Sequence, residues 1–238
     1  MRVAAVGDVH GHQNLEPFRR DLEALGPVDL VLLAGDTTDR NDAEAFDLVL
    51  ETLRARVDAP AFAVFGNNEW SQDHTKYAAR ASERYRVRFL QDEAVVVEAR
   101  GSRLRLVGSL GALDRPTWWQ RKNLPHLADE YRRRIAVLDA LLAGDDLRIL
   151  LIHYPPTYAT MGGEKEAWRP ELGCRALEPV LLRRRPTAVV HGHIHKGIPY
   201  ADLRVPRTSL DAFEVGSVSV PVHNVAYPVR HGITVLDL

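Results

Sequence analysis

The chain has very little cysteine and no long apolar run, and both absences exclude classes of protein. Its single cysteine, Cys174, cannot form a disulfide within the chain, which favours a reducing compartment such as the cytoplasm. No apolar run approaches the roughly 20 residues of a membrane-spanning helix. Gly7 and Asp8 break the first apolar run before it could form the core of a signal peptide. We therefore expect a cytoplasmic protein with no membrane partner.

The chain also lacks an excess of charge of either sign. It has 31 basic and 32 acidic residues and a formal net charge of −1. This balance provides no overall attraction to nucleic acid or to an anionic membrane, although a local patch can still form. The arginine runs at 132–134 and 183–185 could contact nucleic acid, but their acidic neighbours favour solvated helix faces. Nucleic acid is therefore a disfavoured partner that the sequence leaves open.

Flexible linkers, internal repeats and low-complexity tracts are absent from the sequence as well. Of the 238 residues, 45% are hydrophobic and 26% are charged, which is the composition of an ordinary soluble globular protein. The chain is long enough to bury a substantial core. These features predict a single domain that spans residues 1–238.

The N-terminal third alternates between short apolar runs and helical patterns. The apolar runs predict buried strands over residues 2–6, 29–34 and 61–65. Apolar residues at helical spacing predict helices over 15–25 and 46–57, and Asn41 followed by Glu44 predicts a capping box for the second. Polar residues follow each strand of this β-α-β-α-β order, where open α/β sheets bind their ligands.

The rest of the chain predicts further strands, two helices and an ordered insertion. Strands are expected over 87–90, 94–99, 103–108, 147–152, 209–220 and 233–236, and in the apolar run that ends at His191. The last two of the numbered ranges are expected to complete a second sheet. A long amphipathic helix is predicted over 127–142 and a shorter one over 177–182. Residues 111–125 predict an ordered insertion because they hold two tryptophans and two prolines.

Imidazole, carboxylate and amide groups follow the ends of the predicted strands: Asp8, His10, Asp36, Asn67, His153, His193 and His195. Mixed nitrogen and oxygen ligands suit Mn²⁺, Fe or Zn²⁺ rather than Ca²⁺ or Mg²⁺. Seven groups exceed the needs of one ion and match two divalent ions if one carboxylate bridges them. Two ions about 3.5–4 Å apart lower the pKa of a bound water to about 7, and the resulting hydroxide can attack phosphorus.

Five short motifs carry a resemblance to a known family: Gly7-Asp8-Val9-His10, Gly35-Asp36-Thr37-Thr38-Asp39-Arg40, Gly66-Asn67-Asn68-Glu69, His153 and Gly192-His193-Ile194-His195. In this order, and each after an apolar run, they resemble the calcineurin-like metallophosphoesterases. The resemblance implies an α/β fold, a four-layer α-β-β-α sandwich of two mixed sheets flanked by helices.

The resemblance also implies roles for individual residues. The implied ligands of the first ion are Asp8, His10, Asp36 and His195. Asp36 also bridges to the second ion, whose further implied ligands are Asn67, His153 and His193. Mn²⁺ is the favoured metal, with Fe or Zn²⁺ as alternatives. Arg40 matches an arginine that contacts substrate phosphate in the protein-phosphatase branch.

Asn68 departs from the family pattern, in which a histidine at this position usually protonates the leaving group. An amide cannot act as a general acid at neutral pH, although it can donate a hydrogen bond to phosphate. Asp39, the usual partner of that histidine, could orient Asn68 instead. His12, His191 and His223 are the candidates for a substitute acid. For His12, a position in the pocket and a position on the surface are about equally favoured. A structural role is favoured for His191, and a structural or exposed position for His223.

Aromatic residues occupy the two irregular segments of the chain. Trp118, Trp119, Tyr158 and Trp168 could form a rim that stacks a nucleobase or an aryl leaving group. Ordinary packing of a long loop is the favoured interpretation. Cys174 is expected to be a small apolar filler.

The predicted function is metal-dependent hydrolysis of a phosphate ester, either a small molecule or a nucleotide, by a metal-bound hydroxide. Phosphodiesters are favoured over phosphomonoesters, because Gly-His-x-His is the ending shared by the phosphodiesterase-like branches and a good leaving group needs no dedicated acid. One alternative is a phosphoprotein or nucleotide phosphatase, because the motifs around Asp8 and Arg40 resemble those of the protein-phosphatase branch. The other is a non-catalytic scaffold, which the retention of every expected ligand argues against. The sequence carries no indication of oligomeric state.

Overall fold

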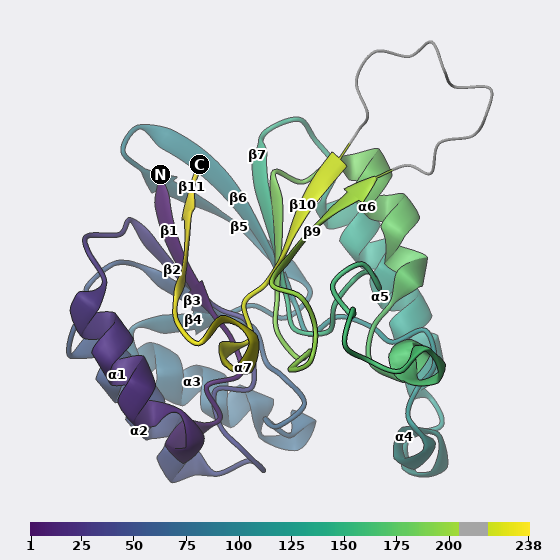
Figure 1. Cartoon of the computed structure of the whole chain (residues 1–238), viewed down its shortest axis with the longest axis horizontal. Coiled ribbons are helices and arrows are strands. Elements are labelled where there is room, and N and C mark those ends of the chain that lie inside the picture. The colour runs from purple at the N-terminus through teal and green to yellow at the C-terminus, as the bar shows by residue number, and fades with distance from the viewer. Residues whose placement is uncertain (205–218) are drawn as a thin grey trace.

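The computed structural model describes residues 1–204 and 219–238. It contains two mixed β-sheets that pack face to face, with helices on the outer face of each sheet (Figure 1). This is the four-layer α-β-β-α sandwich that the motifs implied, so the fold class is confirmed. The strand predicted over 209–220 lies outside the described residues, apart from its last two.

The first sheet has the strand order β11-β1-β2-β3-β4. Its strands are β1 (Arg2–Val6), β2 (Leu30–Leu33), β3 (Ala61–Ala63), β4 (Val87–Phe89) and β11 (Thr234–Asp237). Strands β1 to β4 are parallel, whereas β11 is antiparallel to β1. Its outer face is covered by α1 (Leu15–Ala24), α2 (Ala43–Arg54) and α3 (His74–Tyr85) (Figure 1). The expectation that the last strand would complete the second sheet is wrong, because its backbone pairs with β1.

The second sheet has the order β5-β6-β7-β8-β10-β9. Its strands are β5 (Glu93–Ala99), β6 (Ser102–Ser109), β7 (Leu147–Ile152), β8 (Ala188–His191), β9 (Tyr200–Arg204) and β10 (Ser219–Asn224). The four inner strands are parallel, and β5 and β9 run antiparallel at the edges. Helices α5 (Leu127–Leu141) and α6 (Glu178–Arg184) cover the outer face, and α7 (Tyr227–Arg230) lies between β10 and β11 in the chain (Figure 1).

Three apolar clusters fill the spaces between the four layers. Val3 and Ala5 of β1 belong to the cluster between the sheets, and Ala4 and Val6 to the cluster under the helices of the first sheet. This division follows from the alternation of side chains along a strand. A third cluster lies between the second sheet and its helices. Because both faces of the central strands are buried, they occur in the sequence as continuous apolar runs.

The cap of α2 differs from the expected one. Asp42, not Asn41, accepts hydrogen bonds from the backbone N–H groups of Glu44 and Ala45. Asn41 instead donates a hydrogen bond to Asp73 at 2.7 Å, which joins the loop before α2 to the loop before α3. The cap is therefore one residue later than predicted, and the predicted capping box is wrong, because the third residue after Asp42 is Ala45, which cannot return a side-chain hydrogen bond.

Short helices occupy the irregular segments. The insertion after β6 contains α4 (Trp118–Asn123), which the sequence did not predict as a helix. The 3-10 helices are η1 (Gly11–Gln13), η2 (Ser71–Asp73), η3 (Glu166–Glu171) and η4 (Arg175–Leu177). Within the part of the chain that the structure describes, no helix combines the length and the apolar character needed to cross a membrane.

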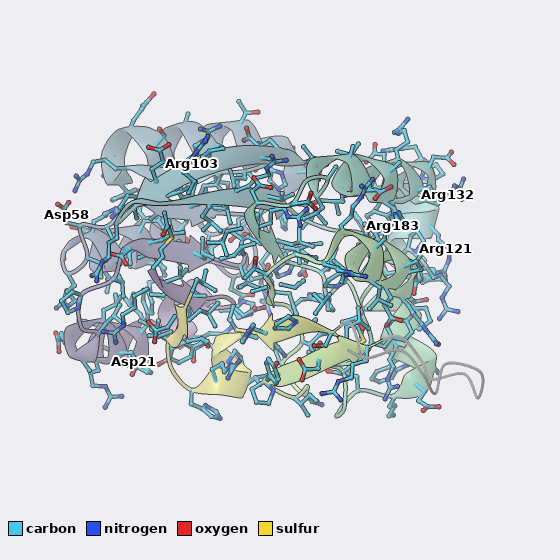
Figure 2. The ribbon with its side chains drawn as sticks, turned by 90° about the horizontal axis from the view of Figure 1, so that it is seen from above. Asp21, Asp58, Arg103, Arg121, Arg132 and Arg183 are labelled. Atoms are coloured by element: carbon cyan, nitrogen blue, oxygen red, sulfur yellow. The ribbon has the colours of Figure 1, made fainter. Side chains whose placement is uncertain are left out.

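Most side chains of the arginine runs are exposed on the helices that cover the second sheet, whereas Arg134 is only 17% exposed and pairs with Asp92. Arg132 pairs with Asp129, and Arg183 pairs with Asp139 at 3.0 Å. Figure 2 shows Arg132 at the edge of the molecule, and the side chain of Arg183 is 52% exposed. These side chains therefore already have acidic partners, as the sequence-based preference for solvated helix faces requires.

Candidate metal centre

The loops at the carboxyl ends of the parallel strands meet at one edge of the two sheets. The residues predicted as metal ligands there are Asp8 and His10 after β1, Asp36 after β2, Asn67 after β3, His153 after β7, and His193 and His195 after β8. Six of them form two groups, in each of which one ligand atom per residue lies within 4.8 Å of the others. The first group is Asp8, His10 and His195, and the second is Asp36, His153 and His193.

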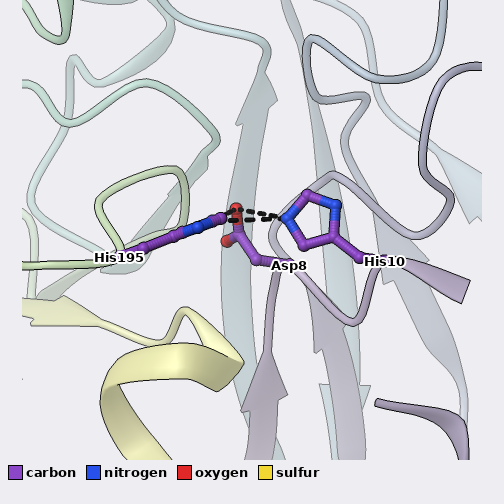
Figure 3. A group of neighbouring side chains, drawn as sticks. All are labelled: Asp8, His10 and His195. Atoms are coloured by element: carbon purple, nitrogen blue, oxygen red, sulfur yellow. Dashed lines mark hydrogen bonds and ion pairs between the residues drawn. The ribbon is translucent and has the colours of Figure 1, made fainter. Parts of the chain in front are cut away.

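The first group is built around the buried carboxylate of Asp8. His195 Nε2 lies 3.0 Å from Asp8 Oδ1, and His10 Nε2 lies 3.8 Å from the same oxygen (Figure 3). The two imidazole nitrogens are 3.3 Å apart. The backbone N–H of His193 donates to both oxygens of Asp8, at 2.8 and 3.1 Å. This contact fixes the carboxylate and links the first group to the loop after β8.

In the second group, the surroundings of His153 indicate which ring nitrogen carries its hydrogen. Its Nδ1 lies 2.9 Å from the carbonyl oxygen of Ala34, which can only accept, so Nδ1 is the donor. Burial lowers the pKa of His153, and its neutral ring therefore presents a lone pair at Nε2. This nitrogen faces Asn67 Oδ1 at 3.1 Å and Asp36 Oδ1 at 3.7 Å. Lone pairs that converge in this way are the arrangement that a metal ion satisfies.

Asp36 lies between the two groups. Its Oδ1 is 3.7 Å from His153 Nε2 in the second group, and its Oδ2 is 3.9 Å from His10 Nε2 in the first. One carboxylate thus turns one oxygen toward each group, an arrangement that a bridging ligand can adopt. With Asn67 beside His153, the structure brings all seven predicted ligands together.

Burial and close charges shift the pKa values of the centre. Burial, and next the repulsion from Asp8, raise the pKa of Asp36 to about 7. Burial opposes ionisation of Asp8 as well, but the hydrogen bond from His195 and the nearby imidazoles leave its pKa lowered. The hydrogen bond to Asp8 raises the pKa of His195, whereas burial lowers that of His193. Divalent cations would relieve the repulsion between these two carboxylates, so the donor set fits such ions.

The backbone at the centre is held in an uncommon conformation. Four of the candidate ligands have φ in the left-handed region: Asp8 (56°), His10 (52°), Asp36 (48°) and His193 (68°). This conformation costs roughly 1–2 kcal/mol for a residue other than glycine, and such residues cluster at functional sites. The turn after each strand is therefore shaped to direct its side chain at the shared centre.

A family model described as calcineurin-like phosphoesterase matches residues 1–197. The chain belongs to this family. The match includes every residue of the two groups, and the family implies divalent metal ions, for which these groups are the candidate positions. No curated protein sequence matches the chain.

Several solved structures share the fold of this calcineurin-like phosphoesterase. Phosphopantetheinyl hydrolase (PptH) from Mycobacterium tuberculosis has a TM-score of 0.67 and 19% identity, over 95% of this chain and 89% of that one. The protein TT1561 from Thermus thermophilus has a TM-score of 0.58 and 17% identity, over 99% and 98%. A putative 5'-nucleotidase from Staphylococcus aureus has a TM-score of 0.56 and 13% identity, over 99% and 50%. These identities establish likeness of fold.

Asn68, at the position where the family usually has an acid, holds the carboxylate of Asp36. Its side-chain N–H donates to Asp36 Oδ2 and its backbone N–H to Asp36 Oδ1, both at 2.8 Å. Its side-chain oxygen accepts a hydrogen bond from the backbone of Arg40 at 3.1 Å. Asp39, which could have oriented Asn68, lies instead 3.7 Å from the guanidinium of Arg40. The side chain of Asn68 is thus engaged on both sides within the protein.

The other residues considered for catalysis are not members of the two groups. The side chain of Arg40 is 88% exposed, and His12 is exposed in η1. His191 is buried and hydrogen-bonded to Thr160, and burial lowers its pKa to about 4. Burial also lowers the pKa of His223 to about 4. Within residues 1–204 and 219–238, none of the three candidate acids belongs to either ligand group.

Glu69 is a residue of the centre that sequence reasoning did not single out. Its buried carboxylate accepts hydrogen bonds from the backbone N–H groups of Asp36 (3.2 Å), Thr38 (3.0 Å) and Gly66 (2.7 Å). It therefore ties the loop after β2 to the loop after β3. Burial, and next the repulsion from Asp36, raise its pKa to about 7. Its place at the end of the third motif was the available signal, but the motif alone does not tell which way a side chain points.

Glu69→Gln is expected to change how the stability of the metal-free protein depends on pH. The carboxyl has a pKa of about 7 when folded and 4.5 ordinarily, so rising pH across this interval removes a proton from the unfolded chain first. The wild type therefore loses on the order of 3 kcal/mol of stability there, whereas the glutamine has no proton to lose. Thermal unfolding of both proteins in the presence of a chelator, at several pH values, measures how the stability of the variant rises relative to that of the wild type.

The exposed Glu98→Gln serves as the control, because Glu98 is paired only on the surface with Arg103. A stability difference between Glu69→Gln and wild type that stays constant from pH 4.5 to 7 would contradict the assignment of the raised pKa to Glu69.

Proposed function

We propose that this calcineurin-like phosphoesterase is a binuclear metal enzyme that hydrolyses phosphodiester bonds, with phosphomonoesters as the second substrate class. The observation that carries the proposal is the position of Asp36, whose two oxygens face one ligand group each. Bound at these groups, a pair of divalent ions would lower the pKa of a water to about 7 and neutralise charge on the phosphate. Mn²⁺ is the favoured metal, with Fe and Zn²⁺ as alternatives, because the donor set mixes nitrogen and oxygen.

The residues of the chain supply position and charge around the phosphate. The backbone of His193 holds Asp8, and Asn68 holds Asp36, so neither carboxylate can turn away when an anion enters the centre. Arg40 extends an exposed guanidinium from the loop that carries Asp36. It can donate charge-assisted hydrogen bonds to phosphate oxygens.

The preference for phosphodiesters rests on the leaving group. Asn68 cannot give up a proton at neutral pH, and its amide is already bonded to Asp36 and Arg40. An ester whose leaving group departs as a stable anion needs no such proton. Aryl diesters and other activated diesters therefore fit this centre better than alkyl esters.

We expect the hydrolysis rate to fall steeply as the pKa of the leaving group rises. A general acid contributes about 10²–10⁴-fold to the departure of a poor leaving group, so alkyl phosphodiesters should react at least about 100-fold more slowly than the aryl series. The measurement is kcat/KM for a series of aryl and alkyl diesters in Mn²⁺. A flat dependence would show that another residue donates the proton.

Arg40 favours a second candidate function, a nucleotide or phosphoprotein phosphatase, because such an exposed arginine suits a terminal phosphate with three free oxygens. One screen separates the candidates. The protein is purified, its bound metal is measured, and its hydrolysis of cyclic nucleotides, aryl diesters, monoesters and a phosphopantetheinyl ester is followed in the presence of Mn²⁺. If the metal-loaded protein hydrolyses none of these compounds, the result favours the non-catalytic scaffold. A cytoplasmic location and a single domain remain part of the proposal.

A further inference from the structure

All four tryptophans of the chain lie on the edge that carries the metal centre. Trp70 is in the loop after β3, Trp118 and Trp119 are in the insertion after β6, and Trp168 follows β7. Their exposed fractions are 49%, 65%, 58% and 53%. Tryptophan is ordinarily among the more buried residues, so the favoured expectation that these rings pack within a loop is wrong for Trp118, Trp119 and Trp168.

The insertion that carries Trp118 and Trp119 is held in place by hydrogen bonds and ion pairs. Helix α4 begins with a capping box, in which Thr117 and Gln120 each bond the backbone of the other. Arg115 and Arg121 both pair with Glu171, at 3.0 and 3.1 Å, which joins α4 to η3. In Figure 1, α4 lies at the end of the molecule toward which β1 runs. The exposed rings are thus presented by ordered structure on the side of the centre.

The lysines gather on the same edge and lack acidic partners. The chain has four, of which Lys76 and Lys196 follow β3 and β8, and Lys122 and Lys165 lie beside the exposed rings. Throughout 1–204 and 219–238, no lysine takes part in an ion pair within 4.0 Å. The ammonium of Lys122 lies 5.3 Å from the ring centre of Trp118. That of Lys165 lies 4.6 Å from the ring centre of Trp168.

These five residues, Trp118, Trp119, Lys122, Lys165 and Trp168, are called here the tryptophan rim. The rim is connected to the loop that carries the metal centre. Gly163 packs against the carbonyl oxygen of Lys196, where a Cβ would overlap it, and Lys196 directly follows His195. Trp168 is five residues beyond Gly163, so the chain places them at most about 18 Å apart.

We propose that the tryptophan rim binds the base and a neighbouring phosphate of a nucleotide, so that the substrate is an ester of a nucleoside diphosphate. The rings offer faces on which a base stacks. The two unpaired ammonium groups offer charge to a phosphate next to that base. The assignment of this ligand as substrate rests on the proposed function, whereas binding at the rim does not.

Binding is tested in Asp36→Asn, the variant designed to lack turnover, by the anisotropy of a fluorescent ADP carrying an N-methylanthraniloyl group. ADP should displace this probe more strongly than adenosine or inorganic pyrophosphate, because only ADP offers both base and phosphate. Adding Trp118→Ala with Trp119→Ala should weaken binding at least about tenfold, and Lys122→Gln several-fold. Val137→Ala, which removes an exposed apolar side chain from α5 outside the rim, is the matched control.

Unchanged ADP affinity in the double tryptophan variant would overturn the proposal. So would equal displacement by ADP and pyrophosphate, which would indicate a site for phosphate alone. Blue-shifted tryptophan fluorescence with phosphatidylglycerol vesicles, in protein that does not bind ADP, would assign the rim to a lipid surface instead. ADP binding without hydrolysis of any nucleotide ester by the metal-loaded wild type would leave the rim assigned as a binding site and contradict its assignment to the substrate. Only the absence of hydrolysis for every ester of the screen would contradict the proposed function.

Discussion

Asp36→Asn is expected to lose most of the bound metal and roughly 10³-fold or more of the activity. The carboxylate of Asp36 directs Oδ1 toward His153 and Oδ2 toward His10, so a single change affects both ligand groups. Asparagine keeps the shape but removes the charge and turns one of the two oxygens into a donor. Metal content after gel filtration and kcat/KM in saturating Mn²⁺ measure the two losses.

The loss should not come from unfolding. Because the pKa of Asp36 is raised to about 7, its ionisation destabilises the metal-free folded state as pH rises toward 7 and above. Asparagine removes that ionisation, so metal-free Asp36→Asn should unfold at the same temperature as wild type at pH 8, or higher. Added Mn²⁺ should stabilise the wild type and not the variant. The exposed Asp58→Asn, which affects one surface ion pair with Arg86, is the matched control. Wild-type activity in metal-replete Asp36→Asn would refute the bridging assignment.

The residues at the strand ends could be predicted from the sequence because their context is local. Asp8, Asp36 and His153 each lie within three residues of the end of a buried strand, and parallel strands place their carboxyl ends on one edge. Figure 3 shows the consequence, with His195 and His10 meeting at Asp8 from distant parts of the chain. The hydrophobic pattern indicated the strands, and the parallel arrangement of these strands brings the residues at their ends together.

Contacts that depend on side-chain direction could not be predicted in this way. Asp39 was one possible partner of Asn68, but the loop after β3 turns the amide of Asn68 toward Asp36. The buried position of Glu69 depends on three backbone N–H groups from two loops, which no sequence spacing shows. The pairing of β11 with β1 has the same origin, because an edge strand of a few residues carries no local signal for its sheet.

The second large effect is expected from Gly66→Ala in the third motif. A Cβ at Gly66 would overlap the carboxylate oxygen Oδ1 and the backbone nitrogen of Asp36 and would lie 2.7 Å from its Cγ. The backbone nitrogen cannot move aside, because Glu69 holds both it and the nitrogen of Gly66. Overpacking of this kind costs about 1–3 kcal/mol, which corresponds to a fall in Tm of roughly 2–12 °C for a chain of this size.

The displacement of Asp36 should also separate the two ligand groups, so that the folded fraction of Gly66→Ala binds metal more weakly than wild type. Gly232→Ala is the control, because the nearest atom to a Cβ there, in Asp21, is 3.8 Å away. Titration with Mn²⁺ at a temperature where Gly66→Ala remains folded tests the metal centre independently of stability. Wild-type metal affinity together with a wild-type Tm would show that the loop after β3 can yield, and that the position of Asp36 does not depend on the absence of a side chain at residue 66.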